Sequence, residues 1–305
     1  MTSLVLILQI FACLCLGYFL APHLSQSLKQ FVYKILPYFS YILLISVAFE
    51  LTQALNHIEN PTAILPPALL IAFTTSVGSF FICLMVYKLI DRQSVQGKIS
   101  LHLFLNALKN IGKAFMALAA GIGLGMLIQS LELHITFNSW YLLLVFIFLI
   151  GIELAFTQFD RSWLSWKILL VPVAAFVGSC LAALFNYFIL SNDYGLNEVM
   201  ALAQGYGWYS MSGILFTELH SAKLGGIALL TDLFREIFAI LLMYCLGWRF
   251  PRSAISSAGA TSMDVTLAMV KQSCGTRYVP HAMMSGLILS LLAPLLISLF
   301  LSMKF

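Results

Sequence analysis

Long apolar runs separated by short polar stretches are the feature that most limits how this chain can fold. Each run is close to the roughly 20 residues that an α-helix needs to cross the hydrocarbon core of a bilayer. Hydrophobic residues make up 61% of the 305-residue chain and charged residues only 9%, whereas a soluble domain carries about 25% charged residues. The pattern therefore predicts an all-α polytopic membrane protein. The ten runs are residues 3–20, 35–54, 63–88, 114–131, 140–157, 168–190, 198–220, 225–248, 254–274 and 279–303.

Two of these runs, 198–220 and 254–274, are poor membrane spans. Gly, Ser and Thr occupy their centres, at residues 205–213 and 256–264, where a span is normally most apolar. In lipid, irregular backbone is tolerated only where protein or a water-filled cavity covers its polar groups. We therefore expect two re-entrant hairpins, each entering and leaving the membrane on one side, and eight transmembrane helices from the remaining runs.

The distribution of Lys and Arg favours one orientation of this arrangement. With the N-terminus outside, thirteen of the sixteen basic residues fall in inside loops, as the positive-inside rule predicts. Lys223 and Lys304 fall outside, Arg235 lies within a span, and both termini are outside. The thirteen inside residues are Lys29, Lys34, Lys88, Arg92, Lys98, Lys109, Lys113, Arg161, Lys167, Arg249, Arg252, Lys271 and Arg277.

Short matches in a constant order indicate an internal repeat in which the first three spans correspond to the next three. Because three is odd, the second copy would insert with inverted topology, as in many secondary transporters. The hairpins, each followed by one span, form a second pair of inverted units whose tips can meet near the membrane midplane. The matches are Val77–Ser79 and Tyr87 with Val177–Ser179 and Tyr187, Phe49–Leu51 with Ile152–Leu154, and Leu16–Gly17 with Leu124–Gly125.

The repeat divides the chain into a six-span region, residues 1–196, and a region of two hairpin–span units, residues 197–305. Spans 3 and 6 are expected to join the later region in a mobile core, while the other early spans form a scaffold. Short Gly and Ser matches also arise wherever helices pack closely in a membrane, and this is the alternative explanation of the repeat.

Three ionisable residues, Asp232, Arg235 and Glu236, interrupt the apolar run 225–248. Their spacing places them on one face of a helix. We expect Arg235 to balance one of the two acids, which leaves one carboxylate near mid-span at Glu236 and a second at Asp264. Acids without a partner inside a membrane indicate a functional site, because they need a bound cation or proton.

Hydroxyl and aromatic side chains in the two interrupted runs complete the expected substrate site. Hydroxyls can exchange hydrogen bonds with a ligand, and broken helices expose N–H groups and carbonyls that suit a carboxylate and a cation. The aromatic residues could line the pocket or form a cation–π contact with an ammonium, or alternatively anchor the chain at the membrane interface. The hydroxyl residues are Thr261, Ser262, Ser210 and Ser212, and the aromatic residues are Trp208 and Tyr209.

The sequence offers no pattern typical of an enzyme or a cofactor protein. The six cysteines and six histidines have no metal-ligand spacing, so no metal site is expected. We find no nucleophile triad, phosphate-binding loop or dinucleotide-binding turn, and the basic residues lie in short loops, so no nucleic acid is expected as a partner. If the chain transports a substrate, it is therefore expected to be a secondary transporter without a cofactor.

Three runs resemble the bacterial LysO-type L-lysine exporter family: Gly205–Leu215, Asp232–Glu236 and Gly259–Asp264. The resemblance implies export of L-lysine, and of its toxic analogue thialysine, across a bacterial inner membrane. It also implies that Glu236 and Asp264 occupy essential intramembrane acidic positions. Ala268 departs from the proline that many members carry there. The inferred arrangement is similar to glutamate-transporter homologues, an analogy of fold alone.

Several functions stay open at this point. The expected function is proton antiport of L-lysine, with the lipid bilayer as surroundings and a homo-oligomer as an open alternative. A second interpretation is a sodium-coupled carrier of organic anions or amino acids, in which Arg235 binds the substrate. A third is a membrane sensor or scaffold that transports nothing, although such a protein has no need of paired broken segments.

Overall fold

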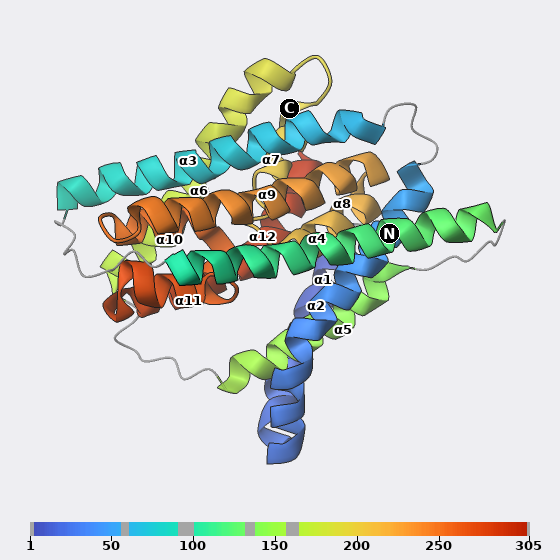
Figure 1. Ribbon diagram of the computed structural model, residues 1–305, viewed down its shortest axis with the longest axis horizontal. Helices are drawn as coiled ribbons and strands as arrows, with labels where there is room; N and C mark the ends of the chain where they lie inside the picture. The colour runs from blue at the N-terminus through green and yellow to red at the C-terminus, as the bar shows by residue number, and fades with distance from the viewer. Residues whose placement is uncertain (1–2, 56–60, 91–100, 132–137, 157–164, 304–305) are drawn as a thin grey trace. The chain divides into compact units, whose positions relative to one another are not determined.

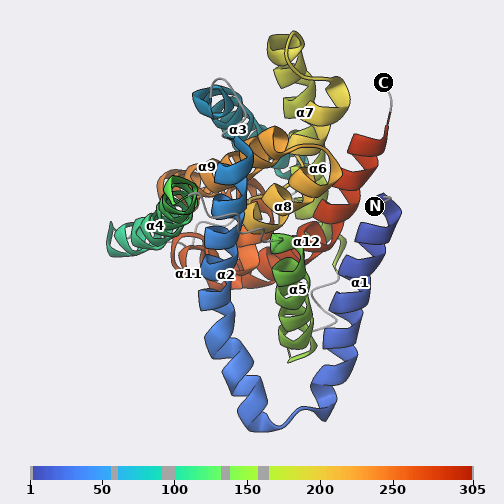
Figure 2. The ribbon, with the colours of Figure 1, turned by 90° about the vertical axis from the view of Figure 1, so that its right-hand side faces the viewer.

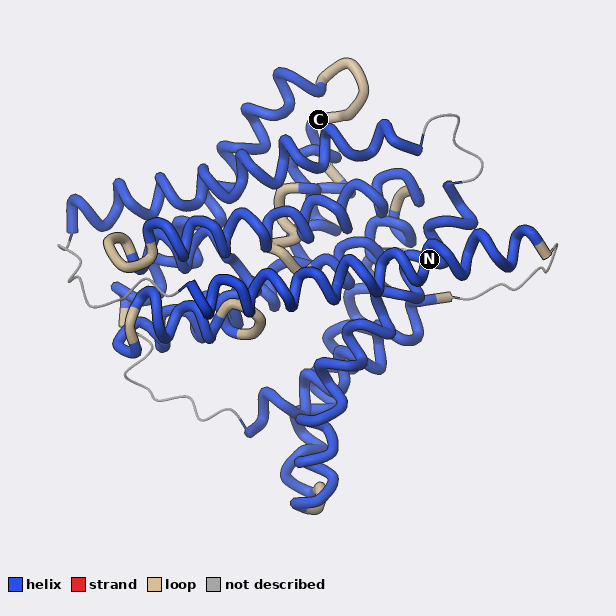
Figure 3. Tube along the Cα trace, in the orientation of Figure 1, coloured by secondary structure: helices blue, strands red, loops and turns tan. Residues whose placement is uncertain are grey.

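The structure, a computed structural model, describes residues 3–55, 61–90, 101–131, 138–156 and 165–303. These residues form helices, and none of them forms a strand (Figure 3). The long helices are α1 (Ser3–Leu20), α2 (Gln26–Leu55), α3 (Leu65–Ile90), α4 (Leu101–Ser130), α5 (Ser139–Phe156), α6 (Trp166–Leu190), α9 (Ala222–Leu246) and α12 (Val279–Ser302). The short ones are η1 (Ala21–His23), η2 (Pro61–Ile64), α7 (Leu196–Leu202), α8 (Tyr209–Leu219), α10 (Pro251–Ala258), η4 (Gly259–Met263), α11 (Leu267–Met269), η5 (Val270–Cys274) and η6 (Thr276–Tyr278).

Each apolar run of the sequence corresponds to a helical segment, and the two poor spans are the broken ones. The run 198–220 forms α7 and α8 with non-helical residues between them, and the run 254–274 forms α10, η4, α11 and the π-helix η5. The predicted interruptions are therefore confirmed. Helices α2 and α4 begin earlier than their apolar runs, because polar helix-forming residues extend both to 30 residues.

Five helices of the described part are long and apolar enough to cross a membrane. A sixth is reached if the bent pair Gln26–Leu36 and Tyr38–Gln53 counts as one span. Helix α9 has 25 residues, which is long enough, but its three central ionisable residues lower its apolar character. The five are Leu65–Ile90, Phe104–Ser130, Ser139–Phe156, Trp166–Leu190 and Thr276–Ser302. The predicted fold class, an all-α polytopic membrane protein, is thus confirmed.

Packing divides the chain into two units. Unit 1 consists of Met1–Pro61, Gly112–Phe159 and Gly213–Gly226. Within it α5 lies between α1 and α2 (Figure 2). Glycines make these contacts close, because a side chain on Gly17 would overlap the carbonyl of Phe148 and one on Gly151 would overlap the carbonyl of Leu14.

Helix α4 packs on α2 in the same unit through two further glycines. A Cβ on Gly121 would overlap the carbonyl of Ile45, and a Cβ on Gly125 would lie 2.9 Å from the Cβ of Thr52. Backbone-to-backbone packing through small residues is a common mode of association between membrane helices. The contacts of α1 with α5 and of α4 with α2 are therefore both close backbone contacts at glycines.

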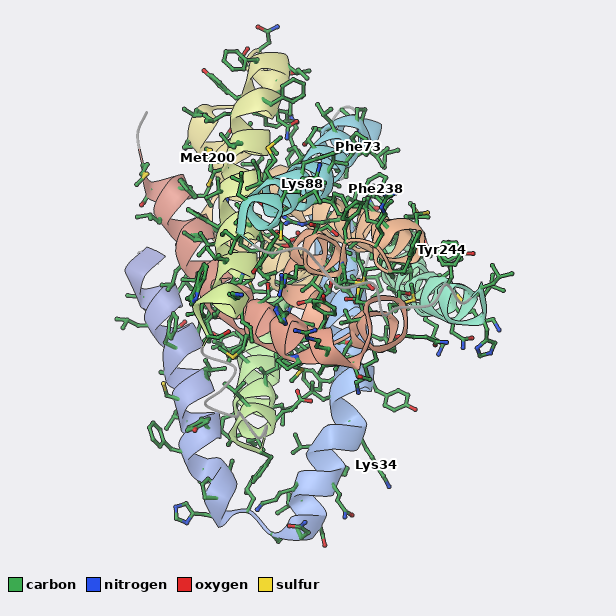
Figure 4. The ribbon with its side chains drawn as sticks, turned by 90° about the vertical axis from the view of Figure 1, so that its left-hand side faces the viewer. Lys34, Phe73, Lys88, Met200, Phe238 and Tyr244 are labelled. Carbon is green, nitrogen blue, oxygen red and sulfur yellow. The ribbon has the colours of Figure 1, made fainter. Side chains whose placement is uncertain are left out.

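Unit 2 consists of Thr62–Ile111, Asp160–Ser212 and Ile227–Phe305. It contains the crossing of α3 and α6, where a Cβ on Gly178 would lie 2.5 Å from the Cα of Ser79. Helix α9 runs beside α3, and the rings of Phe73 and Phe238 meet edge-to-face at 5.5 Å (Figures 1 and 4). Unit 2 also holds α7, α10 and α12 and the non-helical residues after α7, whereas α8 from Gly213 onward and the start of α9, to Gly226, belong to unit 1.

Candidate functional site

The first break lies between α7 and α8, at residues 203–208. Its backbone enters the left-handed region twice, with φ of 54° at Tyr206 and 87° at Gly207. Glycine adopts this region freely, but for a bulky residue it is strained. Backbone strain of this kind is concentrated at functional sites. The break interrupts the helix so that its N–H groups need other acceptors.

Asp232, on α9, supplies one of these acceptors. Its carboxylate accepts hydrogen bonds from the Gly207 N–H at 2.8 Å and from the Ser212 hydroxyl at 2.5 Å. A Cβ on Gly205 would overlap this carboxylate, so only glycine fits there. Asp232 is 1% exposed and is therefore closed in by the first break.

The second break follows α10. Gly259 has φ of 63°, η4 forms a short tight turn, and Asp264 ends it with φ of −120° and ψ of −101°. The carbonyl of Thr261 accepts hydrogen bonds from the N–H groups of Asp264 and Thr266, both at 3.1 Å. The Ser262 hydroxyl hydrogen-bonds the carbonyls of Gly259 and Ala282 at 2.8 and 2.9 Å. Ser262 thus ties this break to α12, which carries Ala282.

The two breaks meet within unit 2. The Ala260 N–H donates to the Tyr206 carbonyl at 3.0 Å. A Cβ on Gly207 would lie 2.9 Å from the Thr261 methyl group, and a Cβ on Gly259 would lie 2.8 Å from the Tyr206 carbonyl oxygen. The expectation that the broken segments touch is therefore confirmed, although residues 206 and 260 are far apart in the sequence.

Arg235 is held by protein groups. Its guanidinium donates to the Ala203 carbonyl at 3.1 Å and lies 5.0 Å from the Tyr206 ring centre. It also donates to the hydroxyls of Ser179 and Ser79, at 3.2 and 3.4 Å. Arg235 is 1% exposed. It therefore joins the crossing of α3 and α6 to the end of α7.

These contacts differ from the pairing of Arg235 with one acid that the sequence indicated. Asp232 acts on Arg235 through its charge, but each side chain hydrogen-bonds other groups. The reason lies in their surroundings, because Asp232 faces Gly207 and Ser212, whereas the guanidinium of Arg235 faces the Ala203 carbonyl and the serines of α3 and α6.

Glu236 and Asp264 form the acidic centre of unit 2. Glu236 is 3% exposed, and the neighbouring charge that acts on it is that of Asp264. Asp264 is exposed. The second break thus places an accessible carboxylate near a buried one.

The other residues expected at the site lie in the same breaks or at the start of α8. Thr261 donates its hydroxyl to the Ala258 carbonyl at 2.9 Å, so it caps its own turn. Ser210 is buried, whereas Trp208 and Tyr209 are half-buried at the start of α8. All ten expected site residues therefore lie in unit 2, on α9, at the start of α8 or in one of the two breaks.

Sequence reasoning missed four polar groups near this site. Ser79 and Ser179 were noticed only as matching positions of a repeat, and their hydroxyls lie 3.4 Å apart. Tyr206 hydrogen-bonds the Gln204 side chain at 2.5 Å while its ring faces Arg235. The offset of 100 residues between the serines was the available signal, since equivalent positions in a two-fold repeat can meet at its axis.

The fold and the site define a multi-pass helical membrane protein whose interior holds carboxylates on and beside a broken helix pair. Residues 115–301 match the sequence profile of the family described as "Lysine exporter LysO". The chain belongs to this family, which is one of membrane transporters. The resemblance noted from the sequence is therefore confirmed.

Two relatives extend the comparison. The chain is 32% identical to "Lysine exporter LysO" of Escherichia coli over 305 residues, which cover 96% of this chain and 98% of the relative. It is 30% identical to the "Putative lysine exporter" of Haemophilus influenzae over 186 residues, which cover 60% of this chain and 94% of the relative. No solved structure matches the chain.

Proposed function

We propose that this protein exports L-lysine, and thialysine with it, across the bacterial inner membrane by proton antiport at Glu236 and Asp264. One observation carries the proposal: Glu236 is buried on α9, and the charge that acts on it is the second carboxylate. A buried carboxylate beside a like charge is stabilised by a proton or a bound cation. Membership of the lysine exporter family names an ammonium compound as the cation.

The surroundings of Arg235 favour a cationic substrate over an organic anion. An anion carrier would use Arg235 to bind its substrate, but here the guanidinium already contacts Ala203, Ser79, Ser179 and the Tyr206 ring. Losing these contacts would leave buried polar groups unpaired, which costs about 1–3 kcal/mol for each group. The carboxylates of Glu236 and Asp264 are the better candidates for substrate contact.

Proton coupling follows from the charge of lysine. Expelling a cation from a negative cell interior costs about 2.3 kcal/mol per elementary charge per 100 mV. Exchange of one proton for one lysine cancels this electrical cost and leaves the pH gradient as the driving force. The carrier loaded with one proton and the carrier loaded with one lysine then both keep a single net negative charge at the two acids, whereas the empty carrier holds two and crosses poorly.

We infer eight membrane spans, two re-entrant hairpins and both termini outside. Helix α9 supplies one of the spans in spite of its three ionisable residues, since Asp232 and Arg235 have protein partners. The inverted repeat is supported by packing: Gly17 contacts α5 near Ile152, and Gly125 contacts α2 near Phe49. These four residues are two pairs of positions that the repeat makes equivalent.

The transport motion that we propose is a movement of unit 2 as one body. Its helices α3, α6 and α12, most of α9 and the two breaks belong to the spans and hairpins that the sequence assigned to a mobile core, whereas residues 213–226 of that core, in α8 and the start of α9, lie in unit 1. The remaining helices, mostly in unit 1, form the scaffold, as in the glutamate-transporter analogy. The boundary at residue 196 separates the six-span region from the two hairpin–span units. It follows the sequence repeats, whereas the proposed motion separates unit 2 from unit 1.

The proposed function predicts loss of export when either acid is neutralised. Glu236→Gln and Asp264→Asn remove the charge with little change of shape, so both variants are expected to insert normally and lose lysine export by at least tenfold. Asp193→Asn, in the exposed turn after α6, is the matched control and is expected to transport normally. The measurement is lysine efflux from proteoliposomes with an imposed pH gradient, with and without sodium.

Three results would contradict the proposal. Normal lysine efflux in both acid variants would remove the two carboxylates from the mechanism. Efflux that ignores the pH gradient but requires sodium would replace proton antiport by sodium coupling. Absence of any efflux from the unaltered protein, with normal reconstitution, would favour a sensor or scaffold.

A further inference from the structure

The carboxylate of Asp232 is fully engaged by the first break. It accepts the Gly207 N–H at 2.8 Å and the Ser212 hydroxyl at 2.5 Å, and the backbone of Gly205 packs so closely on it that a Cβ there would overlap. The side chain is 1% exposed and Ser212 is 0% exposed. No face of Asp232 is open for a substrate ammonium.

The same contacts reach the second break. Gly207, which Asp232 binds, packs against Thr261, and Tyr206 beside it accepts the Ala260 N–H at 3.0 Å. Thr261 in turn fixes Asp264, because its carbonyl accepts the Asp264 N–H at 3.1 Å. A continuous set of hydrogen bonds and contacts therefore runs from Asp232 to Asp264.

Asp232 also shares a helix face with Glu236, four positions further along α9. The helix fixes the distance between these two residues, and the contacts through the breaks fix the place of Asp264. The conformation of the first break consequently determines how far apart the two acids of the site lie.

We propose that Asp232 is a positioning residue: it holds the first break in the form that brings the second break, and with it Asp264, to the correct distance from Glu236. It neither binds lysine nor carries the transported proton. This inference rests on the proposed function of Glu236 and Asp264. Asp232 thus has a positioning role, whereas Glu236 and Asp264 bind lysine and the proton, although all three acids lie in unit 2.

Two variants test this role. Asp232→Asn keeps an oxygen that accepts the Gly207 N–H, and its amide can donate to Ser212, but it removes a charge. Ser212→Ala keeps the charge and removes one hydrogen bond. For both we expect normal insertion, a KM for lysine raised by about ten- to a hundredfold, which is the loss expected for one hydrogen bond to a charged group, and an unchanged ratio of protons to lysine. Ser46→Ala is the matched control, because Ser46 is a buried serine that donates only within its own helix.

The readouts separate the roles. KM is measured from lysine-dependent flux in proteoliposomes, and the coupling ratio from simultaneous proton and lysine fluxes across a range of pH. Asp232→Asn with normal insertion but no proton coupling would show that Asp232 carries the proton and would overturn the inference. Ser212→Ala with the KM of the unaltered protein would overturn it as well, even if the Asn variant failed to insert. Unaltered export in Glu236→Gln and Asp264→Asn would instead refute the proposed function.

Discussion

The three ionisable residues of α9 illustrate how neighbours on one helix face acquire different surroundings. Asp232 accepts two hydrogen bonds from the first break, Arg235 donates to groups of α3, α6 and the end of α7, and Glu236 has the charge of Asp264 as its neighbour. A buried charge is costly unless it is paired and hydrogen-bonded. Glu236 is therefore the member of the three that most needs a ligand.

Replacing Arg235 by lysine tests whether this side chain is structural. A lysine keeps the positive charge but has a single ammonium, which cannot contact Ala203 and both serines in the flat geometry of a guanidinium. We expect Arg235→Lys to lower the unfolding temperature in a thermal-shift measurement, with a loss of about 1–3 kcal/mol. The variant is expected still to transport the substrate L-lysine in preference to anionic amino acids.

The anion-carrier alternative gives a different result for the same variant. If Arg235 bound the substrate, Arg235→Lys would change substrate preference without lowering stability. Competition of lysine and glutamate for transport by the purified variant distinguishes the two outcomes. Lys223→Arg, in the first turn of α9, is the matched control for an exchange of the same two residue types.

At the scale of the elements, the positions of the helices and breaks could be predicted because they depend on local composition. The apolar runs predicted the helices, and the Gly- and Ser-rich stretches near Gly205 and Gly259 predicted the two breaks. The partners of Arg235 could not be predicted, since Ser79 lies 156 positions away in the sequence and no local periodicity connects the two. The early start of α2 was missed because Gln and Lys form helices outside an apolar run as readily as within one.

Two cysteine substitutions test the predicted topology of these elements. In a background without the six native cysteines, Asn192→Cys, after α6, is expected to react with an impermeant thiol reagent added outside whole cells. Arg249→Cys, after α9, is expected to react only after the reagent reaches the inside, because the positive-inside rule places this basic residue there. Both positions are exposed, so a lack of access cannot produce the difference.

The opposite labelling of Arg249→Cys would contradict the topology. Reaction from the outside alone would mean that the segment of α7 and α8 crosses the membrane fully. The span count would then change, and the two broken segments would no longer enter from opposite faces.

At the scale of the whole molecule, the two packing units lead to a prediction about motion. Phe73 and Phe238, on α3 and α9, belong to unit 2 and their rings meet at 5.5 Å (Figure 4). If unit 2 moves as one body, joining these helices leaves the transport cycle intact. We expect the double variant Phe73→Cys and Phe238→Cys, cross-linked by a short bifunctional thiol reagent, to retain most of its lysine efflux.

The control for this experiment is the same double variant without the reagent, which measures the effect of losing the two rings. Efflux that stops on cross-linking and returns when a cleavable reagent is cut would mean that α3 and α9 separate during transport. Such a result would replace motion of a whole unit by local opening within it.

The contact between the two breaks has a consequence for how this protein tolerates change. The contact consists of a main-chain hydrogen bond from Ala260 to Tyr206 and of close packing at Gly207 and Gly259. Every residue except proline carries the same main-chain N–H group, so exchanges of the Ala260 side chain for other non-proline residues leave the hydrogen bond in place. A saturation screen for thialysine resistance would therefore detect this contact as two glycines that accept no replacement, beside a neighbour that accepts small residues.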